Sequence, residues 1–244
     1  MYKAIMGFFQ QILDAVLPDT CVVCQQAVQP SAQHRSCPHC WAALPRIINP
    51  CRHCALPLQR DDICGQCQQK PLCENSCIAA LLHQGVGRDL VHKLKYSHGL
   101  REGHTLANAM LEAISLRYSN QPLPQAIIPV PLTYWRQVRR GFNQAAWLSH
   151  LLSRELDIPV LIRHIHRHPG SAQHKKNRAA RLQLPDNSFS IGKPIGWQHV
   201  AVVDDVLTTG ATVTGLTNHL RRAGACTVDI WCATRTTAFN HNPP

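Results

Sequence analysis

The 244-residue sequence has no run of about 18 apolar residues, so no segment is predicted to cross a membrane as a helix. Its apolar start is interrupted by Gln10, Gln11 and Asp14 and lacks a clear small-residue cleavage site. We interpret residues 1–17 as an amphipathic helix that packs on its own protein rather than as a signal peptide. The sequence therefore predicts a cytoplasmic protein.

Acidic residues are scarce: 14 aspartates and glutamates stand against 25 lysines and arginines, for a formal net charge of +11. A positive excess of this size favours polyanionic partners, such as phosphorylated substrates or nucleic acid. Aromatic residues make up only 6% of the chain. That composition gives little support for a platform on which the bases of single-stranded DNA could stack.

Cysteine, in contrast, is abundant: the chain has 12, and most of them form CxxC pairs in its first third, which points to metal binding in a reducing compartment. A CxxC turn places two thiolates on one side of a loop, and two such turns complete a tetrahedron around Zn²⁺. The gaps between pairs are too short for a core of their own. The pairs therefore predict a double zinc ribbon over residues 18–77 that folds around two structural zinc ions. The predicted ligands are Cys21, Cys24, Cys37, Cys40, Cys51, Cys54, Cys64 and Cys67.

The spacing favours pairing in sequence order, with the first two CxxC turns on one metal and the last two on the other. Interleaved pairing stays open as the alternative. His39 and His53 lie inside the turns and are expected to be solvated rather than ligands. Cys73 and Cys77 lie just beyond the pairs and could replace a zinc ligand, but they are expected to be buried or free thiols. Cys226 and Cys232 are expected to pack in the core on one face of a C-terminal strand.

The most distinctive segment, residues 199–212, reads HVAVVDDVLTTGAT. Its β-branched residues predict a buried strand, and residues 213–224 predict a helix after a short loop of hydroxyls and glycine. Loop amides and a helix N-terminus can hold a phosphate. The carboxylates of Asp204 and Asp205 can accept hydrogen bonds from ribose hydroxyls.

This segment resembles the motif with which type I phosphoribosyltransferases bind 5-phosphoribosyl 1-diphosphate (PRPP) together with Mg²⁺. The shared pattern is an apolar strand, two acidic residues, an apolar pair and TTGxT. The resemblance implies that Asp204 and Asp205 contact the ribose 2′- and 3′-hydroxyls. It also implies that the loop cradles the 5′-phosphate through Thr208, Thr209, Gly210, Ala211 and Thr212.

A second anion site is predicted after residues 126–130, which read as a strand. A loop follows, and residues 141–156 then read as a helix. Arginine suits phosphate because its planar fork donates two hydrogen bonds at once. In the transferase fold this loop usually holds the departing pyrophosphate. The resemblance thus assigns that role to Arg136, Arg139, Arg140, Gly141, Asn143 and Gln144.

The remaining segments are less specific. Residues 78–83 predict a strand, and residues 86–96 and 100–118 predict helices. Lys93 and Lys95 fit contact with substrate or nucleic acid as well as they fit a solvated face. Residues 163–189 are basic and punctuated by Gly and Pro, which fits a hood that closes over bound diphosphate or a solvated loop. Within it, Lys175 and Lys176 are candidate nucleic-acid contacts.

Taken together, PVP…RxxRRGFNQ, the cysteine-rich head and VVDDVLTTGAT resemble the ComF family, the competence-associated phosphoribosyltransferase-like proteins, over essentially the whole chain. The family's KLKY segment is present at residues 93–96, and its Arg163, Gln173 and Arg181 follow. Family members usually carry Asn where this chain has Leu184, which weakens a ligand role for that small subsite.

The resemblance implies an α/β fold: a type I phosphoribosyltransferase-like parallel sheet flanked by helices over residues 78–240, preceded by the small zinc-ribbon domain. It implies a PRPP-binding protein linked to DNA uptake and competence, with an undefined acceptor and with no residue that stands out as a base. The alternative is a non-catalytic protein that senses PRPP or binds single-stranded DNA alongside competence or recombination proteins.

Overall fold

The computed structural model describes residues 19–28, 34–60, 62–97, 99–162, 164–168, 188–192 and 196–237. The expected N-terminal helix lies outside these residues, as does most of the expected hood, including Lys175, Lys176 and Leu184. Among the helices in the described ranges, none combines the length and the hydropathy needed to cross a bilayer.

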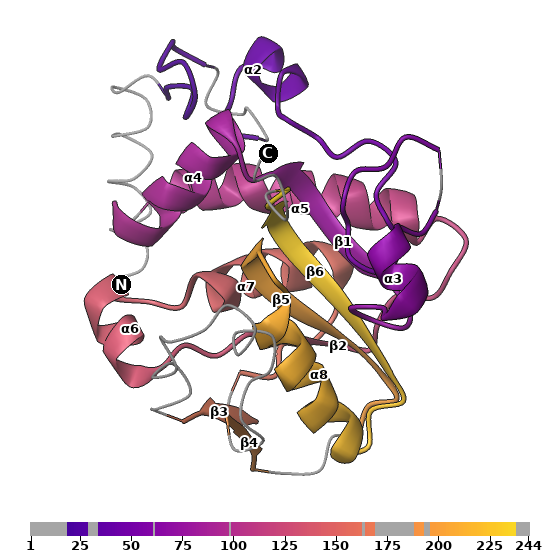
Figure 1. The fold of residues 1–244 in the computed structure, drawn as a ribbon. Helices are drawn as coiled ribbons and strands as arrows, with labels where there is room; N and C mark the ends of the chain where they lie inside the picture. Colours follow the sequence, from indigo (N-terminus) through magenta and orange to yellow (C-terminus); the bar gives the residue numbers. More distant parts are fainter. Residues whose placement is uncertain are drawn as a thin grey trace, which may run out of the picture.

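A parallel sheet with the strand order β1-β6-β5-β2 forms the centre of the fold (Figure 1). The strands are β1 (Cys77–Leu82), β6 (Thr227–Arg235), β5 (His199–Leu207) and β2 (Ala126–Pro129). Residues 200–203 of β5 are all buried because helices cover both faces of a parallel sheet, which explains the unbroken apolar run in the sequence. The predicted α/β class with a parallel sheet is confirmed.

Helices pack on both faces of the sheet (Figure 1). One face is covered by α4 (Gly85–Tyr96), α5 (Leu100–Arg117) and α7 (Gln144–Leu156), whose buried side chains pack against Ala201 and Trp231. The other face is covered by α8 (Ala211–Arg222), which packs on Val200 and Ile230. Two short strands, β3 (Ile165–Arg167) and β4 (Phe189–Ile191), pair antiparallel, and β4 contacts α8.

The segment between β2 and α7 differs from the sequence-based expectation. It was expected to be a loop, but Tyr134–Arg140 forms a short helix, α6. The next helix begins at Gln144 rather than at Gly141, because Gly141 ends α6 with φ +77° and Asn143 caps α7. The Asn143 side chain accepts hydrogen bonds from the amides of Ala145 and Ala146.

The cysteine-rich segment, with its short helices α2 (Pro38–Ala42) and α3 (Gly65–Gln69), covers the free edge of β1. Arg46 forms an antiparallel bridge with Leu81, and the Leu82 amide donates to the Pro45 carbonyl at 2.7 Å. An edge strand that is paired in this way presents fewer free backbone groups to other chains. The predicted boundary between residues 77 and 78 stays a prediction, and β1 begins at Cys77.

Candidate functional site

Two clusters of four cysteines lie in the ribbon, and within each cluster all four sulfur atoms are within 4.8 Å of one another. The first consists of Cys21, Cys24, Cys37 and Cys40, and the second of Cys51, Cys54, Cys64 and Cys67. The structure therefore brings the CxxC turns together in sequence order and not in the interleaved arrangement. Four sulfurs in a compact set fit a tetrahedral Zn²⁺ with no open coordination position.

Backbone amides stabilise the thiolate form that a metal needs. Cys40 N donates to Cys37 Sγ at 3.4 Å, and Cys64 N donates to Cys51 Sγ at 3.3 Å. Burial alone would raise the pKa of the Cys21 thiol, but amide hydrogen bonds from Cys24, Cys37 and Val23 lower it to about 6. Burial raises the pKa of the Cys40 thiol in the same cluster to about 12, so Cys21 ionises more readily than Cys40, which gives up its proton when a cation binds.

The histidines of the turns stay outside the clusters, as expected. His39 is exposed, and His53 Nδ1 lies 2.7 Å from the Cys73 carbonyl oxygen. Cys73, Cys77 and Cys232 are buried, which agrees with their expected place in the core. The expectation for Cys226 was wrong, because this residue precedes β6, is exposed, and directs its thiol to Gln198 Oε1 at 2.8 Å.

We expect protein purified without added metal to contain about two zinc ions per chain, since each cluster offers a complete set of four thiolates. Elemental analysis with a thiol titration under native conditions measures this directly. A metal content near zero, with all cysteines reactive, would contradict the assignment of the clusters as zinc sites.

A cavity of about 310 Å³ opens at the carboxyl ends of β5 and β2, where ligands generally bind to open parallel sheets. Segments far apart in the chain contribute to its wall: the end of α4, α6, the start of α7, β3, and the turn between β5 and α8. The lining residues are His83, Lys95, Val130, Leu132, Arg136, Arg140, Asn143, Gln144, Ala145, Arg167, Asp204, Asp205, Val206, Thr208 and Thr212.

The acidic pair at the end of β5 lies in this wall. Asp204 Oδ1 accepts a hydrogen bond from the Asp205 amide at 2.9 Å, and Asp205 Oδ2 lies 3.0 Å from Lys95 Nζ. Burial, followed by the negative charge of Asp205, raises the pKa of the Asp204 carboxyl to about 7. Near neutral pH, Asp204 can therefore exchange its proton when a cation or a hydrogen-bond donor enters the cavity.

Only part of the predicted phosphate loop faces the cavity. Thr208 and Thr212 line it, whereas Thr209 Oγ1 lies back on the loop as an acceptor for the Ala211 amide at 3.3 Å. Gly210 is the residue before α8 and has φ +78°, a left-handed conformation that favours glycine. The middle of the loop, Thr209 to Ala211, determines the shape of the turn. The two ends of the loop, Thr208 and Thr212, face the cavity where a ligand would lie.

The predicted arginine site is built by α6. Arg136 and Arg140 are four residues apart, so they share one face of the helix, and both line the cavity. Arg140 Nη1 donates to Gln144 Oε1 at 3.1 Å, and Asn143 Nδ2 donates to the Val130 carbonyl at 3.0 Å. Arg139 is exposed and is not part of the wall, while Gly141 ends the helix.

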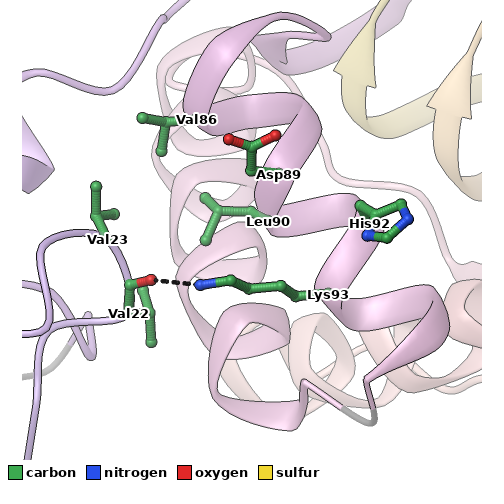
Figure 2. A pocket seen from close by; sticks show the side chains of 7 residues that line it. All are labelled: Val22, Val23, Val86, Asp89, Leu90, His92 and Lys93. Atoms are coloured by element: carbon green, nitrogen blue, oxygen red, sulfur yellow. Dashed lines mark hydrogen bonds between the residues drawn. The ribbon is translucent and has the colours of Figure 1, made fainter.

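The two lysines of the KLKY segment differ in their contacts. Lys95 lies in the cavity wall. Lys93 Nζ instead donates to the Val22 carbonyl at 3.2 Å (Figure 2). It also lies 3.7 Å from Glu102 Oε1. It borders a separate cavity of about 290 Å³ between the first CxxC turn and α4. Lys93 thus links the zinc ribbon to α4 and does not line the larger cavity.

The sequence assigned no site role to His83 and named Arg167 only as part of the basic hood, yet both line the larger cavity. His83 Nδ1 lies 2.9 Å from Thr234 Oγ1, and burial lowers the pKa of its imidazole. The Arg167 guanidinium lies over the Phe189 ring, and burial together with the charge of Arg136 lowers its pKa. The signal that could have found His83 is its position directly after a strand of a parallel sheet.

Comparison with known proteins gives three kinds of similarity. The family described as the double zinc ribbon domain matches residues 12–68, which confirms the predicted ribbon. The DNA utilization protein YhgH of Salmonella typhi is 32% identical over 224 residues, covering 90% of this chain and 98% of that protein. Competence protein F of Haemophilus influenzae is 34% identical over 194 residues, covering 74% and 82%. Among solved structures, a purine phosphoribosyltransferase from Pyrococcus horikoshii Ot3 aligns with 58% of this chain and 78% of its own, at 23% identity and a TM-score of 0.33.

Proposed function

The chain belongs to the family of the DNA utilization protein YhgH and competence protein F, as the ComF resemblance predicted, and from this premise we propose that it binds PRPP in the larger cavity. One observation carries the proposal. An acidic pair, the hydroxyl loop before α8 and two arginines one helical turn apart surround the same space, although they come from separate parts of the chain. These are the groups that a ribose bearing two phosphate substituents requires.

Each part of PRPP has a candidate partner. Asp204 and Asp205 accept hydrogen bonds from the ribose hydroxyls, and the loop from Thr208 to Thr212 holds the 5′-phosphate at the N-terminus of α8. Arg136 and Arg140 hold the diphosphate from α6. The carboxylate oxygens also fit Mg²⁺, a hard cation that neutralises diphosphate charge when it is bound.

The chemistry that follows is displacement of pyrophosphate from the anomeric carbon by an acceptor nucleophile. The transition state resembles an oxocarbenium ion, and Arg136 and Arg140 stabilise the charge that develops on the leaving group. The names of the relatives connect them with DNA utilization and competence, and we place this chain in the same processes.

Calorimetry with PRPP and Mg²⁺ is the first test, with ribose 5-phosphate and pyrophosphate as partial ligands. We expect PRPP to bind more tightly than either fragment, because only PRPP contacts both the α8 loop and α6. Pyrophosphate release in the presence of nucleobases then separates a transferase from a PRPP sensor. Equal affinity for PRPP and its fragments, or no heat of binding, would overturn the proposal.

The pKa of Asp204 makes PRPP binding depend on pH. Because burial and the charge of Asp205 raise this pKa to about 7, most molecules carry a proton on Asp204 at pH 6 before PRPP binds. Ribose hydroxyl donors and Mg²⁺ prefer the ionised form, so affinity is expected to be about tenfold lower at pH 6 than at pH 8. Binding near pH 7 should release a proton, which calorimetry in buffers of different ionisation enthalpy measures. Asp204→Asn, the control, should bind more weakly and show a much smaller difference in affinity between pH 6 and pH 8.

A second candidate function rests on the exposed face of α6. Tyr134 and Trp135 are 68% and 74% exposed, and their rings lie 5.7 Å apart. Arg139, which does not line the cavity, is exposed on the same short helix. Aromatic rings beside arginine are the groups on which single-stranded nucleic acid stacks. The low aromatic content of the sequence gave little support for a base-stacking platform, but these two exposed rings are neighbours on α6.

If α6 binds single-stranded DNA, affinity should fall steeply with salt concentration and show little sequence preference. Trp135→Ala is expected to weaken binding by about tenfold, given that stacking on one base contributes about 1–3 kcal/mol. Trp197, 37% exposed and outside α6, provides the matched control as Trp197→Ala. Fluorescence anisotropy with a labelled oligonucleotide measures both variants. Equal affinities for them would remove α6 from the interface.

A further inference from the structure

The second cysteine cluster lies directly against the loop that precedes α8, and Leu72 is one connection between them. Leu72 packs against the buried cysteines of this cluster, among them Cys67. Its side chain reaches Gly210: a Cβ at that position would lie 2.2 Å from Leu72 Cδ1. A side chain at Gly210 would therefore collide with the ribbon.

Arg235 is the second connection. Its side chain is 4% exposed, and its Nε donates to the carbonyl of Cys54, another member of the cluster, at 2.8 Å. Its Nη1 donates to the carbonyls of Leu207 and Thr208 at 3.1 and 2.6 Å. The rigid, buried guanidinium of Arg235 thus links the backbone of a CxxC turn to the backbone at the end of β5 and the start of the following loop.

The first cysteine cluster, in contrast, is attached to helices on the face of the sheet opposite α8. Lys93 donates to the carbonyl of Val22, Arg101 donates to Asp19 and to the Thr20 carbonyl, and Thr105 donates to the His34 carbonyl. These donors belong to α4 and α5. These hydrogen bonds attach the first part of the ribbon to the two helices, away from the loop from Thr208 to Thr212.

We propose that Leu72 and Arg235 are positioning residues that couple the second cysteine cluster to the phosphate loop, so that metal in this cluster and phosphorylated ligand in the cavity strengthen each other's binding. The inference rests on the proposed PRPP site and adds that metal binding regulates the affinity of this site. Arg235 fixes the direction of the Thr208 carbonyl, and Leu72 packs against the left-handed Gly210. Both contacts fix the loop backbone whose amides would face the phosphate. The first cluster stabilises the fold without this coupling.

Coupling between two binding sites is reciprocal, which makes the proposal measurable in the wild-type protein. Zinc affinities are measured by competition with a chromogenic chelator, with and without saturating PRPP. We expect PRPP to raise the affinity of one of the two zinc ions by about fivefold or more and to leave the other unchanged. Cys24→Ser, which removes an exposed ligand of the first cluster, identifies the affected ion as the one held by the second cluster.

Two variants test the connecting residues. Arg235→Lys keeps the charge but loses the planar fork, and Leu72→Ala loses the contact with Gly210. Each should lower PRPP affinity and reduce the effect of PRPP on zinc, with two zinc ions still bound. Arg101→Lys is the matched control, because Arg101 serves the first cluster with the same side chain, and it should change neither quantity.

The outcomes separate the two proposals. If the wild-type protein binds PRPP but neither zinc affinity changes, the coupling is wrong and the PRPP site stands. An equal fall in both zinc affinities would mean that PRPP chelates zinc in solution, and an equal rise would mean that the ligand stabilises the whole fold; either result overturns the coupling. If the wild-type protein does not bind PRPP, both the proposed function and the coupling fail. If the Arg235 and Leu72 variants misfold, the wild-type linkage experiment still decides.

Discussion

Replacing Asp205 by Asn is expected to lower the affinity for PRPP and Mg²⁺ by about ten- to a hundredfold, since a hydrogen bond to a charged group contributes about 1.5–3 kcal/mol. The Asp205 side chain is 11% exposed at the end of β5, and its Oδ2 lies 3.0 Å from Lys95 Nζ. Asparagine keeps the shape and one acceptor oxygen but removes the charge. Calorimetry measures the affinity, and a thermal melt without ligand shows whether the fold is retained.

Asp89→Asn is the control for this variant, because Asp89 is an exposed residue of α4 that pairs with Arg88 and does not line the larger cavity. It should bind PRPP like the wild-type protein. If Asp205→Asn also binds like the wild type, the ribose does not contact this carboxylate, even if PRPP enters the cavity. If the wild-type protein shows no binding, the acidic pair has a different role.

The elements that could be predicted from the sequence are those with strong local signals. The buried strand β5 gives an unbroken apolar run, and the two aspartates and the glycine that follow are unusual at the end of such a strand. CxxC pairs likewise restrict the geometry of their own turns, so the sequence-order pairing followed from short gaps. In both cases the residues that form the feature are neighbours in the chain.

The helix α6 could not be predicted from apolar periodicity, because it has no buried residue. Its two cavity arginines still have helical spacing, but exposed arginines are also common in loops. His83 and Arg167 enter the cavity through the strand order of the sheet and the packing of the β3–β4 pair, which are non-local features. Lys95 was a candidate contact from the sequence, but its pairing with Asp205 is also non-local, because the two residues are more than a hundred positions apart in the chain.

The largest loss of stability is expected at Asp229, a completely buried carboxylate on β6 at the end of the sheet opposite the cavity. It accepts hydrogen bonds from the Tyr118 hydroxyl, from Asn75 Nδ2 at 2.6 Å and from the Ser76 amide at 3.0 Å, and His199 Nε2 lies 2.6 Å away. Burial and the charge of Asp229 raise the pKa of the Tyr118 phenol well above its ordinary value. Asp229 thus joins the end of the ribbon, α5 and β5 at one point.

Asp229→Ala should lower the free energy of unfolding by about 3–5 kcal/mol, since it leaves several buried donors without an acceptor. For a chain of this size, that corresponds to a decrease in Tm of roughly 6–20 °C. Glu112→Ala is the matched control: its exposed carboxylate pairs with Arg46 on the surface and should contribute less than about 1 kcal/mol. Urea titrations of both variants at neutral pH compare the two carboxylates directly. Equal, small losses would mean that water or a rearrangement satisfies the donors around Asp229.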